Sequence, residues 1–257
     1  MSRLAPMPQI MVAPNGARRG KEDHPMLPVT IAETVAVARA CHAAGAGALH
    51  AHVRDADGAH VLDAGLYAEL IAEMALAVPD MPVQITTEAV GRYTPTDQRD
   101  LLRQITPEGV SIGLIEMLGD DDKAAARRCY HSLSEAGVAV QHILYDASQV
   151  QWLAAEIAAG TIPQTDLSVI YVLGRYTKGQ ISAPDDLTPF LTMADQVGLT
   201  PDWGICAFGP TETACLTAAH NLGGKMRVGF ENNLHMADGS IAADNAARVA
   251  ELARLIN

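Results

Sequence analysis

Aromatic residues, cysteines and basic side chains are all scarce in this 257-residue sequence. Aromatics make up 4%, cysteines number four, and 18 Lys and Arg stand against 30 Asp and Glu, for a net charge of -12. This balance excludes a nucleic-acid partner, because the phosphate backbone is bound by clustered Lys and Arg. The cysteines show no CxxC spacing, which excludes a zinc knuckle or a disulfide framework and indicates reduced thiols.

Long apolar runs are also missing. No run approaches the ~20 residues that span a bilayer, and residues 1–6, MSRLAP, lack the apolar core of a signal peptide. We therefore expect a cytoplasmic protein without a membrane or export segment. The 49% apolar content predicts a globular chain with a buried core. Because no linker, low-complexity stretch or charge run divides the chain, residues 1–257 are expected to form a single domain.

Short strand-like runs alternate with longer helical runs along the whole chain. Eight strands are predicted, at residues 9–13, 48–53, 83–87, 110–113, 138–144, 167–172, 203–207 and 226–230. A helix is predicted after each strand, at residues 30–44, 64–76, 95–102, 122–136, 148–159, 185–197, 211–220 and 242–255. Thr30 and Glu33 form a capping-box pattern, and Gly45, Gly137 and Gly198 stand where helices should end.

Strict alternation of strands and helices predicts a parallel sheet with right-handed crossovers. Eight such units in about 250 residues match an α/β protein of the (β/α)8 TIM-barrel class, whereas a doubly wound open sheet is the alternative. Barrel enzymes place their chemistry at the carboxyl ends of the strands. Functional side chains are therefore expected in the last residues of each strand and in the loop that follows.

Two histidines stand near the end of the second predicted strand. His50 and His52 are one residue apart, so both side chains should point to the same face, toward the barrel mouth. Glu231 directly follows the last predicted strand, on the same face as Arg227 by strand parity, and that strand lies close to the second strand in a closed barrel. Two histidines and one carboxylate are typical of a catalytic zinc site, although the same set suits several divalent ions. Hydrogen-bonded rim histidines are the alternative for an HxH pair.

Two segments resemble the signatures of a known family. Residues 46–55, AGALHAHVRD, which follow LPVT at 27–30, are similar to one motif of the β-keto acid cleavage enzymes, and residues 223–233, GGKMRVGFENN, are similar to another. Residues 13–17, APNGA, resemble the first-strand loop of that family. The resemblance therefore extends from the first predicted strand to the eighth and covers nearly the whole chain.

This resemblance implies a zinc-dependent acyltransferase built on a (β/α)8 barrel. Such an enzyme condenses a β-keto acid with acetyl-CoA and yields acetoacetate plus the CoA thioester of the shortened acid. His50, His52 and Glu231 match the family's metal ligands, and Arg227 matches a catalytic arginine. The family also implies a homo-oligomer, commonly a homotetramer.

The sequence departs from the family at two positions of the expected site. Asn232 stands where the family has an aspartate that works with the arginine in deprotonation, and an amide cannot take up that proton. Thr86 and Thr87 match a Ser/Thr pair, but Glu88 replaces a family glycine and is a candidate for the missing carboxylate. Ser111 falls near a hydroxyl position at the end of the fourth strand.

Further side chains are candidates for contacts with the substrate. Asn15 lies in the first-strand loop, and Arg18 follows that loop, where a cation favours a substrate with an anionic distal end, such as a β-keto diacid. The tetrapeptide GRYT occurs after the third and the sixth strand, and its arginines, Arg92 and Arg175, could contact the substrate or the phosphates of CoA. A solvated loop charge is the alternative for Arg18, and coincidence is the alternative for the repeat.

Two other functions remain open from the sequence. One is a different metal-dependent barrel enzyme, a hydrolase or a lyase, although many barrel hydrolases carry HxH on the first strand and barrel metallolyases need an Asp-Arg pair after that strand. The other is a non-catalytic metabolite-binding barrel, which Asn232 in place of aspartate would allow. The sequence leaves the β-keto acid, the general base, the metal and the oligomeric state undecided.

Overall fold

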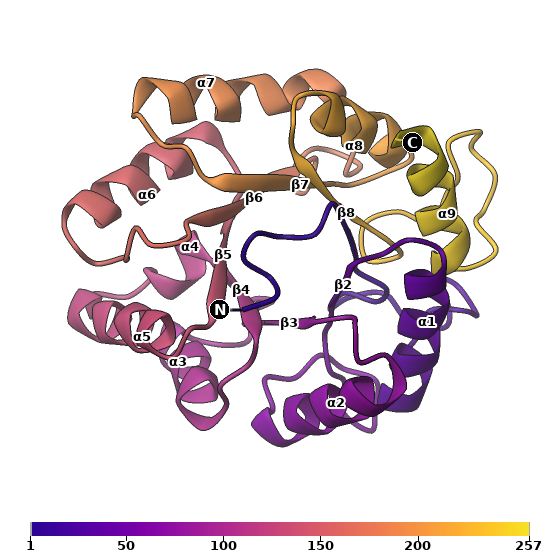
Figure 1. Cartoon of the computed structure of the whole chain (residues 1–257), viewed down its shortest axis with the longest axis horizontal. Helices are drawn as coiled ribbons and strands as arrows, with labels where there is room; N and C mark the ends of the chain where they lie inside the picture. The colour runs from indigo at the N-terminus through magenta and orange to yellow at the C-terminus, as the bar shows by residue number, and fades with distance from the viewer. Residues whose placement is uncertain (1, 257) are drawn as a thin grey trace.

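Eight parallel strands close into a barrel in the computed structural model, which describes residues 2–256 (Figure 1). The strands follow one another around the barrel in chain order, and β1 (Ile10–Val12) closes the ring by pairing with β8 (Lys225–Val228). In this pairing Met11 lies opposite Arg227. The closure confirms the (β/α)8 class and excludes the open sheet.

The remaining elements agree with the predicted alternation. The other strands are β2 (Ala48–His50), β3 (Val83–Thr86), β4 (Gly109–Gly113), β5 (Ala139–Leu144), β6 (Ser168–Leu173) and β7 (Asp202–Ala207). The outer helices are α1 (Ile31–Ala43), α2 (Ala64–Ala77), α3 (Pro95–Gln104), α5 (Lys123–Glu135), α6 (Ala147–Ala158), α7 (Thr188–Gln196), α8 (Glu212–Asn221) and α9 (Asn245–Ile256). The four-residue helix α4 (Leu114–Met117) was not predicted, because one turn is too short to show a helical period. The helix predicted at residues 185–197 begins as the 3-10 helix η1 (Pro184–Leu187) and continues as α7.

Side-chain hydrogen bonds fix the helix starts where the sequence predicts them. The Thr30 hydroxyl accepts from the backbone N–H of Glu33, and the Glu33 carboxylate accepts from the backbone N–H of Thr30, so the predicted capping box forms. Thr94 and Asp97 form the same arrangement at the start of α3. Each box satisfies backbone donors that the first helical turn leaves free.

The barrel has an apolar outer layer and a mixed interior. Side chains such as Val12, Leu49 and Ile85 point outward and belong to the main core between the strands and the helices. Toward the interior, Leu4 packs with Met11 and Ala48 in a small apolar cluster. Polar strand side chains such as Gln84, Gln141 and Arg227 meet inside the barrel, whereas His142 packs against Tyr130 in the outer layer.

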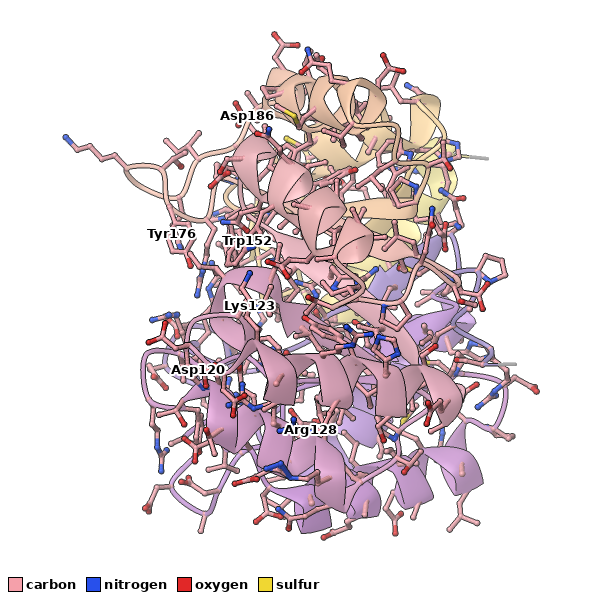
Figure 2. All side chains as sticks on the ribbon, turned by 90° about the vertical axis from the view of Figure 1, so that its left-hand side faces the viewer. Asp120, Lys123, Arg128, Trp152, Tyr176 and Asp186 are labelled. Carbon is pink, nitrogen blue, oxygen red and sulfur yellow. The ribbon has the colours of Figure 1, made fainter. Side chains whose placement is uncertain are left out.

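The loops after the strands lie on one side of the barrel. Figure 2 shows Tyr176, in the loop after β6, and Asp120, in the segment after β4, along this side. Trp152 of α6 lies on the outer helical layer, where its indole N–H donates to Glu156. No helix within residues 2–256 is long and apolar enough to cross a membrane.

Candidate active site

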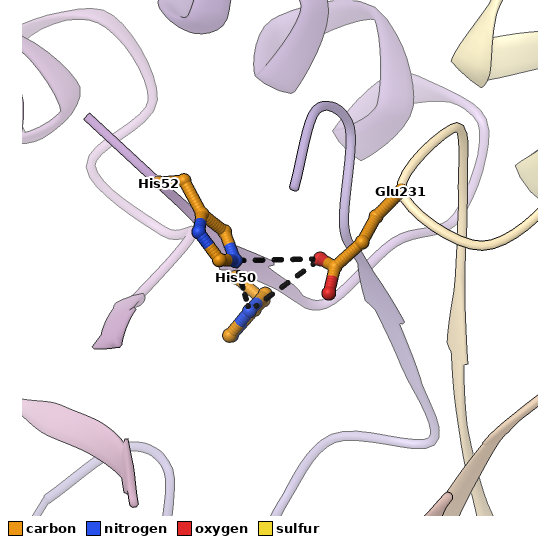
Figure 3. Close-up of side chains that lie close together, drawn as sticks. All are labelled: His50, His52 and Glu231. Carbon is orange, nitrogen blue, oxygen red and sulfur yellow. Dashed lines mark hydrogen bonds and ion pairs between the residues drawn. The ribbon is translucent and has the colours of Figure 1, made fainter. Parts of the chain in front are cut away.

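The two histidines and the glutamate of the predicted metal site converge at the mouth of the barrel (Figure 3). His50 is the last residue of β2, His52 follows it, and Glu231 lies three residues after β8. The Nε2 atoms of the two histidines are 3.3 Å apart. The nearer carboxylate oxygen of Glu231, Oε2, lies 3.5 Å from Nε2 of His50 and 3.7 Å from Nε2 of His52.

Glycines allow Glu231 to reach this position. The chain turns after β8 at Gly229, whose φ of 147° is open to glycine, and an added Cβ there would collide with the carbonyl oxygen of Ala13. A Cβ on Gly16 would stand 2.5 Å from Cγ of Glu231. Strand parity alone would place Glu231 on a straight continuation of β8. In the structure the chain instead turns after Val228, and Glu231 reaches the site from this turn.

The geometry of the three side chains fits a divalent cation. A tetrahedral ion with bonds of about 2.0–2.1 Å keeps its ligands about 3.3–3.4 Å apart, close to the three separations observed here. Oε2 of Glu231 is buried and has no hydrogen-bond partner, although carboxylate oxygens inside proteins are normally paired. Two imidazoles and one carboxylate suit zinc and several other divalent ions.

The electrostatics favour the protonation states that bind metal. Burial and the neighbouring Arg227 lower the pKa of His50 to about 4, and burial together with His60 and His50 lowers the pKa of His52. Burial alone would raise the pKa of Glu231, but the charge of Arg227 lowers it below its usual value. Both imidazoles are therefore neutral and the carboxylate is ionised near pH 7, as metal coordination requires.

Gln84, which the sequence did not single out, orients His50. Its side-chain N–H donates to Oε1 of Gln141 at 3.2 Å, so its own oxygen accepts from Nδ1–H of His50 at 2.8 Å. His50 therefore keeps its Nε2 lone pair available for a metal ion. Gln84 precedes the end of β3 by two residues, and its register partner is His50 itself.

Arg227 lies beside the three side chains of the predicted metal site. Its guanidinium nitrogens approach the ring nitrogens of His50 at 3.4 and 3.5 Å and Oε1 of Glu231 at 3.5 Å. Nη2 also donates to the sulfur of Cys206 at 3.4 Å. The side chain is buried, so its charge acts with little screening by water.

Glu88 faces the same centre from the loop after β3. Its Oε2 lies 3.8 Å from Nε2 of His52, and its Oε1 lies 3.3 Å from Nη2 of Arg175. Burial and the negative charge of Glu231 raise the pKa of Glu88 to about 7. A carboxyl with this pKa is suited to proton transfer near neutral pH.

A cavity of about 110 Å³ opens above these groups. Among its walls are predicted residues from five different strand ends and loops: Asn15, Arg18, His50, His52, Thr86, Glu88, Arg175, Arg227 and Glu231. Asn15 also holds the backbone of His52, since its amide N–H donates to the carbonyl oxygen of His52 at 3.0 Å. The cavity therefore brings most of the predicted site residues together.

Four predicted site residues do not line this cavity. Asn232 is buried, and neither atom of its amide has a hydrogen-bond partner. Thr87 and Ser111 are buried in the barrel wall, where the Thr87 hydroxyl donates to the carbonyl oxygen of Ser111 at 3.5 Å. Arg92 is largely exposed, stacks on the Tyr93 ring at 5.1 Å and donates to the backbone carbonyl of a histidine in the β2–α2 loop.

That histidine, His60, is a neighbour of the site that the sequence did not reveal. Its Nδ1 lies 3.4 Å from Nδ1 of His52, and its Nε2 lies 3.0 Å from the carbonyl oxygen of Glu88. Arg54, in the HVRD motif, was likewise not singled out. Its guanidinium donates to the carbonyl oxygens of Arg19 at 3.0 Å and Gly58 at 2.8 Å, and so ties two site loops together.

Comparison with known proteins identifies the family of this chain. Residues 9–257 match the model of the beta-keto acid cleavage enzyme family. The chain is 27% identical over 246 residues to 3-keto-5-aminohexanoate cleavage enzyme of Fusobacterium nucleatum, covering 93% of this chain and 88% of the relative. It is 25% identical over 270 residues to 3-oxoadipate:acetyl-CoA acetyltransferase of Cupriavidus necator, covering 96% of this chain and 87% of the relative.

Solved structures share the fold. The structure of ObcA with oxaloacetate superimposes with a TM-score of 0.70 at 16% identity over 90% of this chain. The match spans 63% of the ObcA chain, so ObcA is considerably longer. The family match over nearly the whole sequence, together with the histidine pair and the glutamate at the barrel mouth, places this chain in the beta-keto acid cleavage enzyme family.

Proposed function

We propose that this protein exchanges the acyl group of a β-keto acid with acetyl-CoA. The bond between C2 and C3 of the β-keto acid breaks, and its acyl part leaves as a CoA thioester. The remaining C2 unit, with its carboxylate, joins the acetyl group and becomes acetoacetate. The convergence of His50, His52 and Glu231 beside Arg227 in one cavity carries this proposal. The names of relatives that use acetyl-CoA support the co-substrate.

His50, His52 and Glu231 would hold the metal, for which zinc is our proposal. Bound there, the cation would supply a Lewis acid for the keto and carboxylate oxygens of the substrate. The chain itself supplies the surroundings of that site. Arg227, buried at 3.5 Å from Glu231, offers a fixed positive charge for oxygens that become negative during carbon–carbon bond cleavage.

Glu88 is our candidate for the base that removes the proton from C2. It lines the cavity, it lies 3.8 Å from His52, and the pKa of about 7 leaves a large ionised fraction at neutral pH. Asn232 cannot fill this role, because an amide has no basic site and because Asn232 does not line the cavity. The Thr86 hydroxyl is not a base either. It accepts a hydrogen bond from the backbone N–H of Glu88 at 3.1 Å and so helps to position Glu88.

The distal end of the substrate would be anionic. Arg18 and Arg175 both line the cavity, and the guanidinium of Arg175 is held at 4.9 Å from the Phe208 ring. Two guanidinium groups around a small cavity favour a second carboxylate on the substrate, as in a β-keto diacid. The relative named for 3-oxoadipate supports this substrate class.

The test is an assay of purified protein with zinc, acetyl-CoA and a panel of β-keto acids. The panel holds 3-oxoadipate, 3-oxoglutarate and 3-keto-5-aminohexanoate, and mass spectrometry follows acetoacetate and the new CoA thioester. We expect both products in equal amounts, with the diacids turned over most rapidly. Cleavage without acetyl-CoA would instead indicate a hydrolase or lyase, and binding without turnover would indicate a metabolite-binding barrel. The homotetramer and the cytoplasmic location remain predictions.

A further inference from the structure

Three imidazole rings stand in a row at the barrel mouth. The ring centroids of His50 and His52 are 5.2 Å apart, and those of His52 and His60 are 4.8 Å apart, both with edge-to-face geometry. His60 does not belong to the group of side chains that can share a metal ion, since that group comprises His50, His52 and Glu231 in the described chain. Its position behind His52 therefore calls for another role.

The partners of His60 determine which of its nitrogens carries a hydrogen. Its Nε2 lies 3.0 Å from the backbone carbonyl oxygen of Glu88, which can only accept, so Nε2 is the protonated nitrogen. In the neutral ring Nδ1 then has a free lone pair. The carbonyl oxygen of Val53 also neighbours the His60 ring, but the hydrogen-bonding contact of Nδ1 is with Nδ1 of His52 at 3.4 Å, so we infer that Nδ1 of His52 donates. The tautomer that results leaves Nε2 of His52 as the acceptor.

This tautomer is the one that a metal site needs. Nε2 of His52 is the atom that faces Nε2 of His50 at 3.3 Å and the Glu231 carboxylate at 3.7 Å. Gln84 does the same for His50 by accepting from its Nδ1–H. Each ligand imidazole thus has one acceptor behind it, which is how buried side chains commonly orient metal-binding histidines.

The β2–α2 loop holds His60 firmly in this place. His60 pairs with Arg54 in an antiparallel bridge, and the intervening turn is closed by Asp55, whose carboxylate accepts from the backbone N–H of Ala59 at 2.9 Å. Arg92, left outside the cavity, donates to the carbonyl oxygen of His60 at 3.4 Å. The ring is buried with the rest of the site, so water does not compete for its Nδ1.

We propose that His60 is a positioning residue that fixes the tautomer of His52 and thereby strengthens metal binding at the site. The inference rests on the metal site of the proposed function, but not on the reaction. Residues that orient metal ligands typically contribute about 10–100-fold to metal affinity. We expect an effect of that size from His60, seen in binding of the metal alone.

The first experiment measures the Zn²⁺ affinity of metal-free protein by competition with a chromophoric chelator. His60→Phe keeps a ring but has no acceptor, and it should bind Zn²⁺ about 10–100-fold more weakly than the unaltered protein. His60→Asn places an oxygen close to the former Nδ1 and should recover most of the affinity. His235→Phe is the matched control. His235 forms a similar antiparallel bridge, with Ile241, but it lies outside the cavity. This variant should bind Zn²⁺ with the affinity of the unaltered protein.

The second experiment observes the tautomer directly. Long-range ¹H–¹⁵N correlations of ¹⁵N-histidine-labelled, metal-free protein, assigned with a His52→Gln variant, should show hydrogen on Nδ1 of His52. In His60→Phe the hydrogen should move largely to Nε2. If His60→Phe does not fold, as judged by its Tm, the spectrum of the unaltered protein decides the question by itself.

The outcomes separate this inference from the proposed function. Hydrogen on Nε2 of His52 in the unaltered protein, or equal Zn²⁺ affinity in His60→Phe, would overturn the role of His60 and leave the acyl exchange intact. Weaker binding in His60→Phe without acyl exchange in the unaltered protein would overturn only the proposed function. Failure of the unaltered protein to bind Zn²⁺ would overturn both.

Discussion

The barrel interior has two unlike walls near its carboxyl ends. On one side β2, β3 and β8 contribute His50, Gln84 and Arg227 to a hydrogen-bonded polar group. On the other side β5, β6 and β7 contribute the apolar cluster of Ile143, Ile170, Val172, Cys206 and Phe208. The polar wall provides charges and the proposed metal ligands, whereas the apolar wall excludes water and so strengthens the electrostatic interactions opposite it.

Glu88 and Arg175 form an ion pair that joins the two walls, which also meet where Arg227 donates to Cys206. Glu88 follows β3, and its carboxylate pairs with Arg175, which follows β6 and lies over the Phe208 ring. Burial is the larger cause of the raised pKa of Glu88, and the negative charge of Glu231 is the second. The protein that surrounds the carboxyl therefore raises its pKa more than the neighbouring charge does. A site of this kind needs both walls, and each can be weakened separately.

The largest effect should follow from removing the proposed charged metal ligand of the polar wall. Glu231→Gln loses the only carboxylate of the three proposed ligands, so Zn²⁺ binding should collapse. kcat should fall by more than about 10³-fold, because the cation contributes several kcal/mol of charge stabilisation. Zn²⁺ competition titration and the acetoacetate assay measure the two effects. Glu69→Gln, on the exposed face of α2, is the control and should change neither. Full activity in metal-stripped protein would remove the basis for the proposal.

Strand parity explains why this part of the site could be predicted. His50, His52 and Arg227 lie on or beside strands, whose alternation fixes the direction of each side chain, and barrel closure brings β2 and β8 near one another. The same rules predicted all eight strands. Their ends were less certain, since β2 ends at His50 rather than at residue 53.

Loops account for what the sequence did not reveal. His60 reaches His52 because the β2–α2 loop folds back through the bridge with Arg54, and no spacing rule places that contact. The two GRYT copies diverge for the same reason. Arg175 turns into the cavity, whereas Arg92 lies outside it against Tyr93, because the conformation of each loop is set by its own neighbours. Gln84 was missed although it lies on a strand, because its role depends on the register with β2.

The second prediction tests the group that joins the walls. Glu88→Gln keeps the shape of the side chain but cannot take up a proton, so kcat should fall by about 10²–10⁴-fold. In the metal-free protein the pKa of Glu88 is about 7, and a cation held by the neighbouring His52 would lower it. Activity of the metal-loaded enzyme that depends on the carboxylate should therefore rise with pH through a limb below about 7 and then level off. This limb of the kcat–pH profile should vanish in Glu88→Gln, while Zn²⁺ affinity stays nearly unchanged. Survival of the limb would assign the base to another group.

The third prediction concerns substrate choice at the cavity entrance. Arg18→Glu reverses a charge on the cavity wall, so a β-keto diacid should lose about 10-fold in kcat/KM, the equivalent of one modest charge-assisted contact. An amino-substituted β-keto acid should gain relative to the diacid. The ratio of kcat/KM for 3-oxoadipate and 3-keto-5-aminohexanoate measures this change. Arg39→Glu, on the exposed side of α1, is the charge-matched control and should leave the ratio as it is. An unchanged ratio in Arg18→Glu would show that Arg18 does not select the substrate.

The smallest effect should come from the apolar wall itself. Phe208→Leu keeps an apolar side chain but removes the ring that lies 4.9 Å from the Arg175 guanidinium. A cation–π contact of this kind is worth about 0.5–1 kcal/mol, so kcat/KM for a diacid should fall about 2–5-fold as Arg175 becomes less well held. Zn²⁺ affinity should not change, because the polar wall is untouched. A parallel loss of Zn²⁺ affinity would mean that the apolar wall also supports the ligands, and the division of labour between the two walls would then be wrong.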